Sequence, residues 1–287
     1  MKRTCKLKEL DLKMENNVTR TFKNLEHKNE KALIGYIVGG YPTLELSRGI
    51  IEQLILSGVD IIEIGVPFSD PMADGPIIQD AFTKTLNCGI APKDCLNLVK
   101  SIRERHKETP LLLMTYSNIL YSNGLEKFLT QSKNCAIDGF IVPDLNFEEA
   151  DDYLKITTKL GLSTVFLTSP NTSTQRLRKI AVSSTGFVYM VSVFGITGSR
   201  NKFEKYTFES VSRSKSIVSS YGKQLAVGFG ISNAQDGKKM IESGADGIIV
   251  GTSLIKIITN NEHDQSKMMS ELDIFVKELK AICKVPN

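Results

Sequence analysis

The chain has 287 residues, of which 41% are hydrophobic and 24% are charged, and it carries 36 Lys and Arg against 32 Asp and Glu. This composition is that of an ordinary globular protein, which excludes a disordered, collagen-like or disulfide-scaffold chain. A net charge of +4 spread along the sequence predicts no binding to nucleic acid or to a membrane surface. The length suits one or two domains, and an α/β barrel can use most of it as one.

The cysteines and histidines do not indicate a metal site. The five cysteines form no Cys-x-x-Cys pair, and the three histidines show no zinc-ligand spacing. No apolar run approaches the roughly 18 residues that span a bilayer, and the first residues lack the apolar core of a signal peptide. We therefore expect a cytoplasmic protein with free thiols.

Eight short, almost continuously apolar runs alternate with longer segments of helical pattern, as expected for parallel strands that are covered on both faces. Eight strand–helix units without a linker favour a single-domain α/β fold, a closed (β/α)₈ TIM barrel, over an open doubly wound sheet. We assign residues 18–287 to this catalytic barrel and residues 1–17 to a tail that is expected to be flexible. The predicted strands are 33–38, 60–64, 111–116, 139–142, 164–167, 187–192, 225–227 and 247–250, and the predicted helices are 44–57, 76–87, 92–106, 125–133, 147–160, 173–182, 203–220, 234–243 and 265–282.

An internal repeat marks the second predicted strand as unusual. Residues 57–65 and 243–251 agree at Ser, Gly, Asp, one Ile and the final Gly, and residues 137–142 repeat the Asp-led start. The second strand has Glu63 where the eighth has Ile249. A buried carboxylate is costly, so Glu63 is explained by a buried ion pair, by a strand that is solvent-exposed on one face, or by catalysis. No Lys or Arg lies within residues 60–78, and barrel active sites lie at strand C-terminal ends, so we predict a general acid or base with a raised pKa.

The loop after the second predicted strand contains three prolines within residues 65–76. Prolines stiffen a loop, and stiff loops over barrel ends often carry function. Ordinary turn chemistry would instead make Asp70 and Asp74 turn or helix-cap residues. Both interpretations stay open on the residues alone.

The last two predicted strands end at glycines, in residues 228–233 and 251–253. Glycine lets backbone amides approach an anion, and loops after strands 7 and 8 of barrels often bind phosphate. These loops therefore predict a phosphate site. The aromatic residues Tyr36, Tyr189 and Phe229 lie near strand ends, where core packing is the commoner role and a wall for a flat ring is the alternative.

Together these segments resemble the tryptophan synthase alpha chain family, from about Asn24 to Val276. The most specific motif is EIGVPFSDPMADGP at residues 63–76, joined by YMVS at 189–192, GITG at 195–198 and GFGIS at 228–232. The resemblance implies a lyase that cleaves indole-3-glycerol phosphate to indole and glyceraldehyde 3-phosphate, by a retro-aldol reaction, in tryptophan biosynthesis.

The resemblance also implies the role of individual residues. Glu63 and Asp74 match the two catalytic carboxylates. The remaining matches are Gly198, Gly230, Gly251 and Thr252 for the phosphate, Tyr36, Tyr189 and Phe229 for the indole ring, and Asp70, Pro71 and Asn118 for a partner.

That partner is a beta chain holding pyridoxal phosphate, in an alpha2-beta2 heterotetramer, and no cofactor or metal is expected on this chain. One departure is Val193 or Phe194, where many members carry an Arg, and it affects the contacts expected of that loop. Two other interpretations stay open. A neighbouring barrel enzyme would usually employ a Lys near the strand ends, and none stands in predicted strands 1 to 3. A barrel that only binds a partner would not need Glu63.

Overall fold

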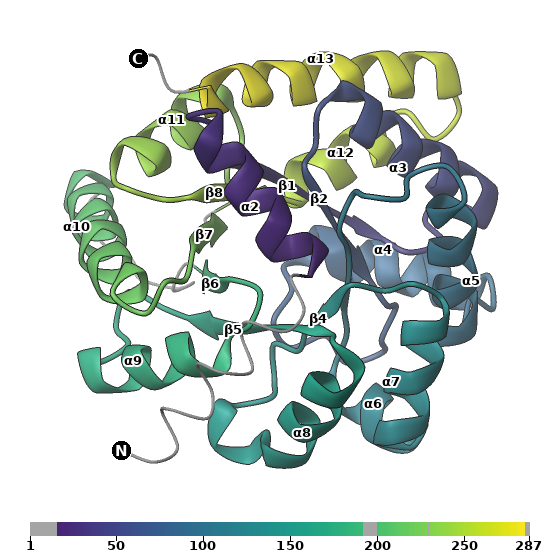
Figure 1. Ribbon diagram of the computed structural model, residues 1–287. Coiled ribbons are helices and arrows are strands. Elements are labelled where there is room, and N and C mark those ends of the chain that lie inside the picture. The colour runs from purple at the N-terminus through teal and green to yellow at the C-terminus, as the bar shows by residue number, and fades with distance from the viewer. Residues whose placement is uncertain (1–15, 192–199, 229, 285–287) are drawn as a thin grey trace.

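The computed structural model describes residues 16–191, 200–228 and 230–284, and it confirms the expected (β/α)₈ barrel. Eight parallel strands close in sequence order, β1 through β8, and at least one helix follows each strand on the outside (Figure 1). The strands are β1 (Ala32–Val38), β2 (Ile61–Gly65), β3 (Leu111–Met114), β4 (Gly139–Ile141), β5 (Ser163–Thr168), β6 (Val188–Val191), β7 (Leu225–Gly228) and β8 (Gly247–Val250).

Most helices lie where the sequence pattern places them. The predicted helix over 92–106 ends at Arg103, and the one over 147–160 divides into a short 3₁₀ turn and a helix. The helices are α3 (Leu44–Ser57), α4 (Pro76–Asn87), α5 (Pro92–Arg103), α7 (Leu125–Asn134), η1 (Phe147–Glu149), α8 (Asp151–Leu160), α9 (Thr174–Ser183), α10 (Arg200–Ser219), α11 (Ala234–Glu242) and α13 (Gln265–Cys283).

Three helices were not expected from the sequence: α2 (Asn17–His27), α6 (Ser117–Ser122) and α12 (Thr252–Asn260). Helix α2 crosses the end of the barrel at which the strands begin (Figure 1). Its buried residues Val18, Phe22 and Leu25 join the apolar cluster inside the barrel. Asn17, which the sequence assigned to the tail, is the first residue of this helix, and the preceding Asn16 caps it by accepting from the Thr19 amide.

Alternate residues of each strand point into the barrel, because successive side chains of a strand face opposite ways. The interior cluster includes Ile34, Ile61, Leu112, Ile141 and Ile249. Glu63 lies two residues after Ile61 and therefore points into the same interior. A larger apolar cluster fills the space between the strands and the outer helices.

The Asp that starts each internal repeat joins two strands and an outer helix. Each carboxylate accepts a hydrogen bond of 2.8–2.9 Å from a backbone amide at the start of the preceding strand, and it also pairs with a cation from a helix. The repeat in the sequence therefore corresponds to a repeated set of one amide hydrogen bond and one ion pair, at the end of the barrel where the strands begin. Each set is called a tie below. The three sets are Asp60 with Leu33 and Lys280, Asp138 with Leu111 and Arg103, and Asp246 with Leu225 and Lys215.

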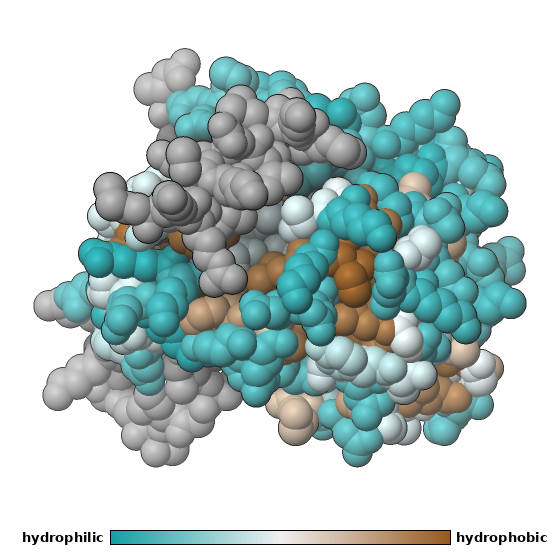
Figure 2. All heavy atoms as spheres, turned by 60° about the horizontal axis from the view of Figure 1, so that its bottom comes forward, coloured by the Kyte–Doolittle hydropathy of each residue, from teal (hydrophilic) through white to brown (hydrophobic). Residues whose placement is uncertain are grey.

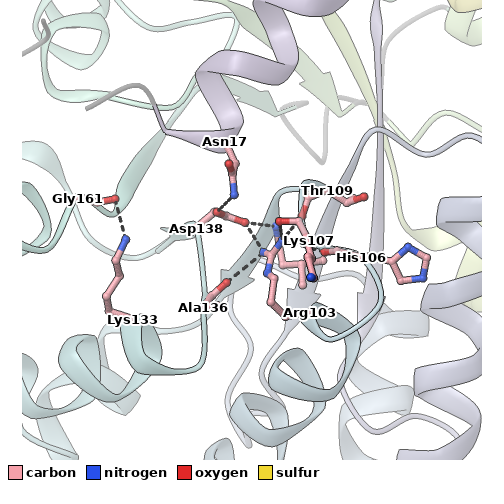
Figure 3. Close-up of polar contacts among 10 residues, drawn as sticks. Asn17, Arg103, His106, Lys107, Thr109, Lys133, Ala136, Asp138 and Gly161 are labelled. Atoms are coloured by element: carbon pink, nitrogen blue, oxygen red, sulfur yellow. Dashed lines mark hydrogen bonds and ion pairs between the residues drawn. The ribbon is translucent and has the colours of Figure 1, made fainter. Parts of the chain in front are cut away.

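The Asp138 tie also reaches helix α2 (Figure 3). Asn17 donates to the carboxylate at 2.7 Å, which fastens α2 to the barrel. The Arg103 guanidinium contacts the other carboxylate oxygen at 2.6 Å. The same guanidinium donates to the backbone carbonyls of His106, Lys107, Thr109 and Ala136.

We expect Asp138→Ala to lower the free energy of unfolding by about 3 kcal/mol, because it leaves a mostly buried guanidinium without its carboxylate. The Arg103 side chain is 14% exposed. Urea unfolding measures the change. The control is Asp152→Ala, whose carboxylate is 78% exposed and pairs with Lys155 on the surface, and it should cost far less than Asp138→Ala because solvent screens an exposed pair. Equal losses in the two variants would contradict a structural role for the tie.

The surface visible in Figure 2 is mostly hydrophilic, and its hydrophobic side chains gather near the centre of the view. In the described part of the chain no helix is long and apolar enough to cross a membrane. No group of three or more His, Cys, Asp or Glu within those residues could hold a metal ion.

Candidate active site

A cavity of about 490 Å³ opens at the C-terminal ends of the strands. It is bounded by the ends of β1, β6, β7 and β8 and by the loop between β2 and α4. Six of the predicted site residues line it: Tyr36, Asp74, Tyr189, Gly230, Gly251 and Thr252. The other lining residues are Met72, Ala73, Gly75, Pro76, Ile77, Ile78, Met114, Leu167, Val191, Gly228, Ile231, Ser232, Ile249, Ser253 and Lys256.

Glu63 is a completely buried carboxyl group next to this cavity. Its side chain is 0% exposed, and neither carboxylate oxygen has a hydrogen-bond partner. In the strand register it lies beside Tyr36 of β1, which lines the cavity, and Leu112 of β3. Burial alone raises the pKa of Glu63 to about 8. The alternative of a buried ion pair therefore fails among the described residues, and the raised pKa expected from the sequence is confirmed.

The rings of Tyr36 and Tyr189 lie at the C-terminal end of the barrel and pack against glycines of neighbouring strands. A Cβ on Gly65 would lie 2.2 Å from the Tyr36 hydroxyl oxygen, and one on Gly228 would lie 2.7 Å from that of Tyr189. A Cβ on Gly251 would meet the Tyr36 ring at 2.9 Å. These glycines therefore leave the space that the rings occupy, a role that the sequence does not reveal.

Tyr36 is buried and Tyr189 is half-buried, and both line the cavity, so they belong to the core and to the wall of the site. Burial is the main cause that raises the pKa of each phenol. The negative charges of Asp74 and Glu63 raise both pKa values further. Glu63 lies beside Tyr36 in the strand register, and Tyr36 lines the cavity together with Asp74, so the two carboxyl groups lie around a single site.

Asp74 is held in place by a tyrosine from the next strand unit. Its carboxylate accepts a hydrogen bond of 2.6 Å from the Tyr116 hydroxyl, which in turn accepts from the Ala73 amide at 3.0 Å. The Tyr116 ring stacks on Phe68 with centroids 5.0 Å apart. Burial raises the pKa of Asp74, and the hydrogen bond from Tyr116 lowers it. The N-cap of α4 is Gly75, without a side-chain bond, so Asp74 does not cap that helix.

Tyr116 is a site residue that the sequence interpretation missed. It was placed at the end of the third predicted strand, and that position at the C-terminal end of a barrel strand was the available signal.

The end of the cavity that the sequence predicts to bind the anion is formed by glycines and by the start of α12. Gly251 is the N-cap of α12 and makes no side-chain cap bond, so the first amides of the helix have no intrahelical partner. Gly230 has φ +67°, and a Cβ added there would meet no atom within 4 Å. With Thr252 these residues offer amides and free space to an anion. Gly198 and Phe229, which were also expected here, lie outside the described residues, as do Val193 and Phe194.

The three residues expected at a partner interface lie on the surface near the cavity. Asp70 is exposed and accepts a hydrogen bond from Ser69 at 2.5 Å, which is consistent with a turn role as well. Pro71 is half-buried in the same loop, and Asn118 is exposed in α6. None of the three lines the cavity.

Comparison with known proteins decides the family. A family model described as "Tryptophan synthase alpha chain" matches residues 22–284. The tryptophan synthase alpha chain of Petrotoga mobilis is 42% identical over 253 residues, which cover 88% of this chain and 96% of that protein. That of Francisella tularensis strain SCHU S4 is 36% identical over 93% of this chain and 98% of the other. The chain belongs to the tryptophan synthase alpha chain family.

Solved structures agree with this membership. Tryptophan synthase subunit alpha from Legionella pneumophila strain Paris superposes with a TM-score of 0.84 at 32% identity, covering 94% of this chain and 99% of that one. A tryptophan synthase structure from M. tuberculosis gives 0.83 at 30% identity, covering 95% of this chain and 100% of the other.

The alpha chain function follows from this membership. The chain is a carbon–carbon lyase that cleaves indole-3-glycerol phosphate in tryptophan biosynthesis, as the resemblance implied. The alpha chain of the family carries no cofactor, and pyridoxal phosphate is on the beta chain. Both other interpretations, a neighbouring barrel enzyme and a barrel that only binds a partner, are therefore set aside.

Proposed function

We propose that Glu63 and Asp74 together perform this cleavage at the barrel mouth. The observation that carries the proposal is the unpartnered, fully buried carboxyl group of Glu63 beside a cavity that contains a second, anchored carboxylate. The indole ring would lie against Tyr36 and Tyr189. The phosphate would lie at the amides of Gly230, Gly251 and Thr252, with Gly198 and Phe229 assigned to the site by family resemblance.

The chemistry requires a group that first gives and then takes a proton. With its pKa near 8, Glu63 is protonated at neutral pH and delivers that proton to C3 of the indole ring. The ring nitrogen then carries positive charge, which the Asp74 carboxylate stabilises by accepting the N1–H bond. The C3–C bond breaks, its electrons return to the ring, and the hydroxyl proton on the departing glycerol carbon passes to Glu63 as the aldehyde forms. This step regenerates the acid.

The direct test is to incubate the purified protein with indole-3-glycerol phosphate, with and without a tryptophan synthase beta chain, and to measure free indole. We expect indole and glyceraldehyde 3-phosphate in equal amounts. No indole under either condition would overturn the proposed site chemistry.

The partner implied by the family is a beta chain, and we propose an alpha2-beta2 assembly in which the cavity end of the barrel faces that partner. Asp70, Pro71 and Asn118 lie on this end, and the neighbouring Met72 side chain is 82% exposed. An apolar side chain this exposed, beside a site whose product is the apolar indole, supports docking over the cavity mouth.

Pro71→Lys and Asn118→Lys should each weaken co-elution with the beta chain, because an interface that forms there would have to bury an unpaired charge. The circular dichroism spectrum should not change, since neither side chain belongs to the core. The control is Val182→Lys near the end of α9, at the opposite end of the barrel, where Val182 is 40% exposed. If all three variants co-elute like the unaltered protein, the interface lies elsewhere.

Two further expectations from the sequence are kept as proposals. We propose that the protein acts in the cytoplasm, which its free cysteines and ordinary surface support. We also propose that residues 18–287 belong to the catalytic unit, which Asn17 joins because it begins α2, and that the residues before this helix form a tail.

A further inference from the structure

Among the described residues that line the cavity two are charged, and one of them has no role in the proposed cleavage. Asp74 is the acidic one, and Lys256 of α12 is the basic one. The remaining described residues of the wall are apolar or carry only hydroxyl, phenol or backbone groups. A substrate with a phosphate dianion therefore meets a single cationic side chain in this part of the cavity.

Lys256 is placed to act at the phosphate end of the cavity. It lies four residues after Thr252, so it stands one helical turn along α12 on the same face of the helix. Helical side chains lean toward the N-terminus of their helix, which directs the long Lys256 stem back toward Gly251 and Thr252. An ammonium group on a flexible stem can reach an anion that is held by those amides.

The charge of Lys256 is not used elsewhere in the described structure. The side chain is exposed, and within the described residues it has neither a carboxylate within ion-pair distance nor a hydrogen-bond acceptor. Lys215 and Lys280, by contrast, are paired with Asp246 and Asp60 at the other end of the barrel. Lys256 is therefore a free cation at the rim of a cavity that receives an anionic substrate.

We propose that Lys256 is a specificity-determining residue that pairs with the phosphate dianion of the substrate. The proposal rests on the proposed function, because it assigns the phosphate to the start of α12. The phosphate keeps its charge throughout the cleavage, so the ion pair stabilises the bound substrate and the transition state equally. Loss of the pair should therefore raise KM and leave kcat nearly as it was.

The test compares Lys256→Met with a matched loss of charge outside the cavity. The control is Lys238→Met on α11, which removes one positive charge from a side chain that is 64% exposed and pairs with Glu242. Lys256→Arg keeps the charge. The ligands are inorganic phosphate and sn-glycerol 3-phosphate, titrated by calorimetry at two ionic strengths, and free indole. Indole-3-glycerol phosphate gives KM and kcat.

For Lys256→Met we expect KM and the Kd of both phosphates to rise about tenfold, the size of one charge-assisted contact. We also expect a weaker dependence of the Kd on salt, because one fewer charge is screened. The Kd of indole and kcat should stay within about twofold of the unaltered protein, and Lys256→Arg should restore phosphate binding.

Equal phosphate affinities in Lys256→Met and Lys238→Met would overturn the assignment of Lys256, even if the unaltered protein releases indole normally. A fall in kcat with KM unchanged would also overturn it, since that result indicates a structural or chemical role. If the unaltered protein released no indole, the proposed function would fail separately, and the titrations with inorganic phosphate would still decide whether Lys256 binds the anion.

Discussion

Glu63→Gln should lower indole formation by about 10²- to 10⁴-fold, the usual contribution of a general acid or base. The amide has nearly the same shape as the carboxyl group but cannot transfer the proton to the indole carbon. Substrate binding should survive, because the phosphate and ring contacts belong to other residues. The measurement is free indole released with the beta chain present. Near-normal release by this variant would remove Glu63 from the mechanism.

The pH dependence gives a second check on the same group. Because the proposed cleavage begins with protonated Glu63, whose pKa is about 8, kcat/KM should hold through neutral pH and fall above about pH 8. The unfolded carboxyl group ionises near its ordinary pKa of 4.5. Between these two values the folded state binds more protons than the unfolded state, so the free energy of unfolding should fall as the pH rises.

Glu63→Leu separates the free-energy cost of burying the carboxyl group from its catalytic role. It should be inactive and more stable than the unaltered protein, because an unpartnered buried acid gives way to an apolar side chain. The gain in thermal midpoint should grow between about pH 5 and pH 8. Over this range the unfolded carboxyl group is ionised while the folded protein keeps Glu63 protonated, and the free-energy cost of keeping that proton grows with pH. A loss of stability at pH 8 would mean that Glu63 has a structural partner.

Asp74→Asn should lower indole formation by about 10²- to 10³-fold, because it removes the negative charge that we propose stabilises the indole N1–H in the transition state. The amide oxygen can still accept from Tyr116, so the fold should not change. Asp80→Asn is the control, since Asp80 lies on the surface of α4 and pairs with Lys84 at 3.4 Å. Equal activities of the two variants would contradict the assignment of Asp74.

Tyr116→Phe distinguishes a charge effect from a positioning effect at the same place. It keeps the ring against Phe68 but removes the hydroxyl that donates to Asp74. Because that hydrogen bond lowers the pKa of Asp74, its loss should raise the pKa of Asp74. On acidification the rate should therefore begin to fall at a higher pH than in the unaltered protein. The rate at neutral pH should fall less than it does in Asp74→Asn. An unchanged dependence of the rate on pH at the acidic side would show that Tyr116 does not act through Asp74.

Several features of the molecule are determined by the sequence itself. The apolar runs and the repeated Asp-led turns are sufficient for eight parallel strands, because strands buried on both faces need uniformly apolar residues. Glu63 stands out for the same reason, since a carboxyl group in such a strand is costly unless it is used. The glycines at the ends of β7 and β8 likewise predict the proposed anion site from the sequence alone. The closed barrel confirms the fold that these patterns predicted, and family membership confirms the reaction that the resemblance implied.

Other features were decided only when the barrel closed. Tyr116 donates a hydrogen bond to Asp74, which is 42 residues away in the sequence. The rings of Tyr36 and Tyr189 pack against glycines of other strands. Helix α2 has only three buried residues in a charged segment. They close the end of the barrel because they pack against its interior cluster. These contacts depend on strand register and closure, which bring distant residues together, whereas sequence patterns report the environment of each residue along its own element.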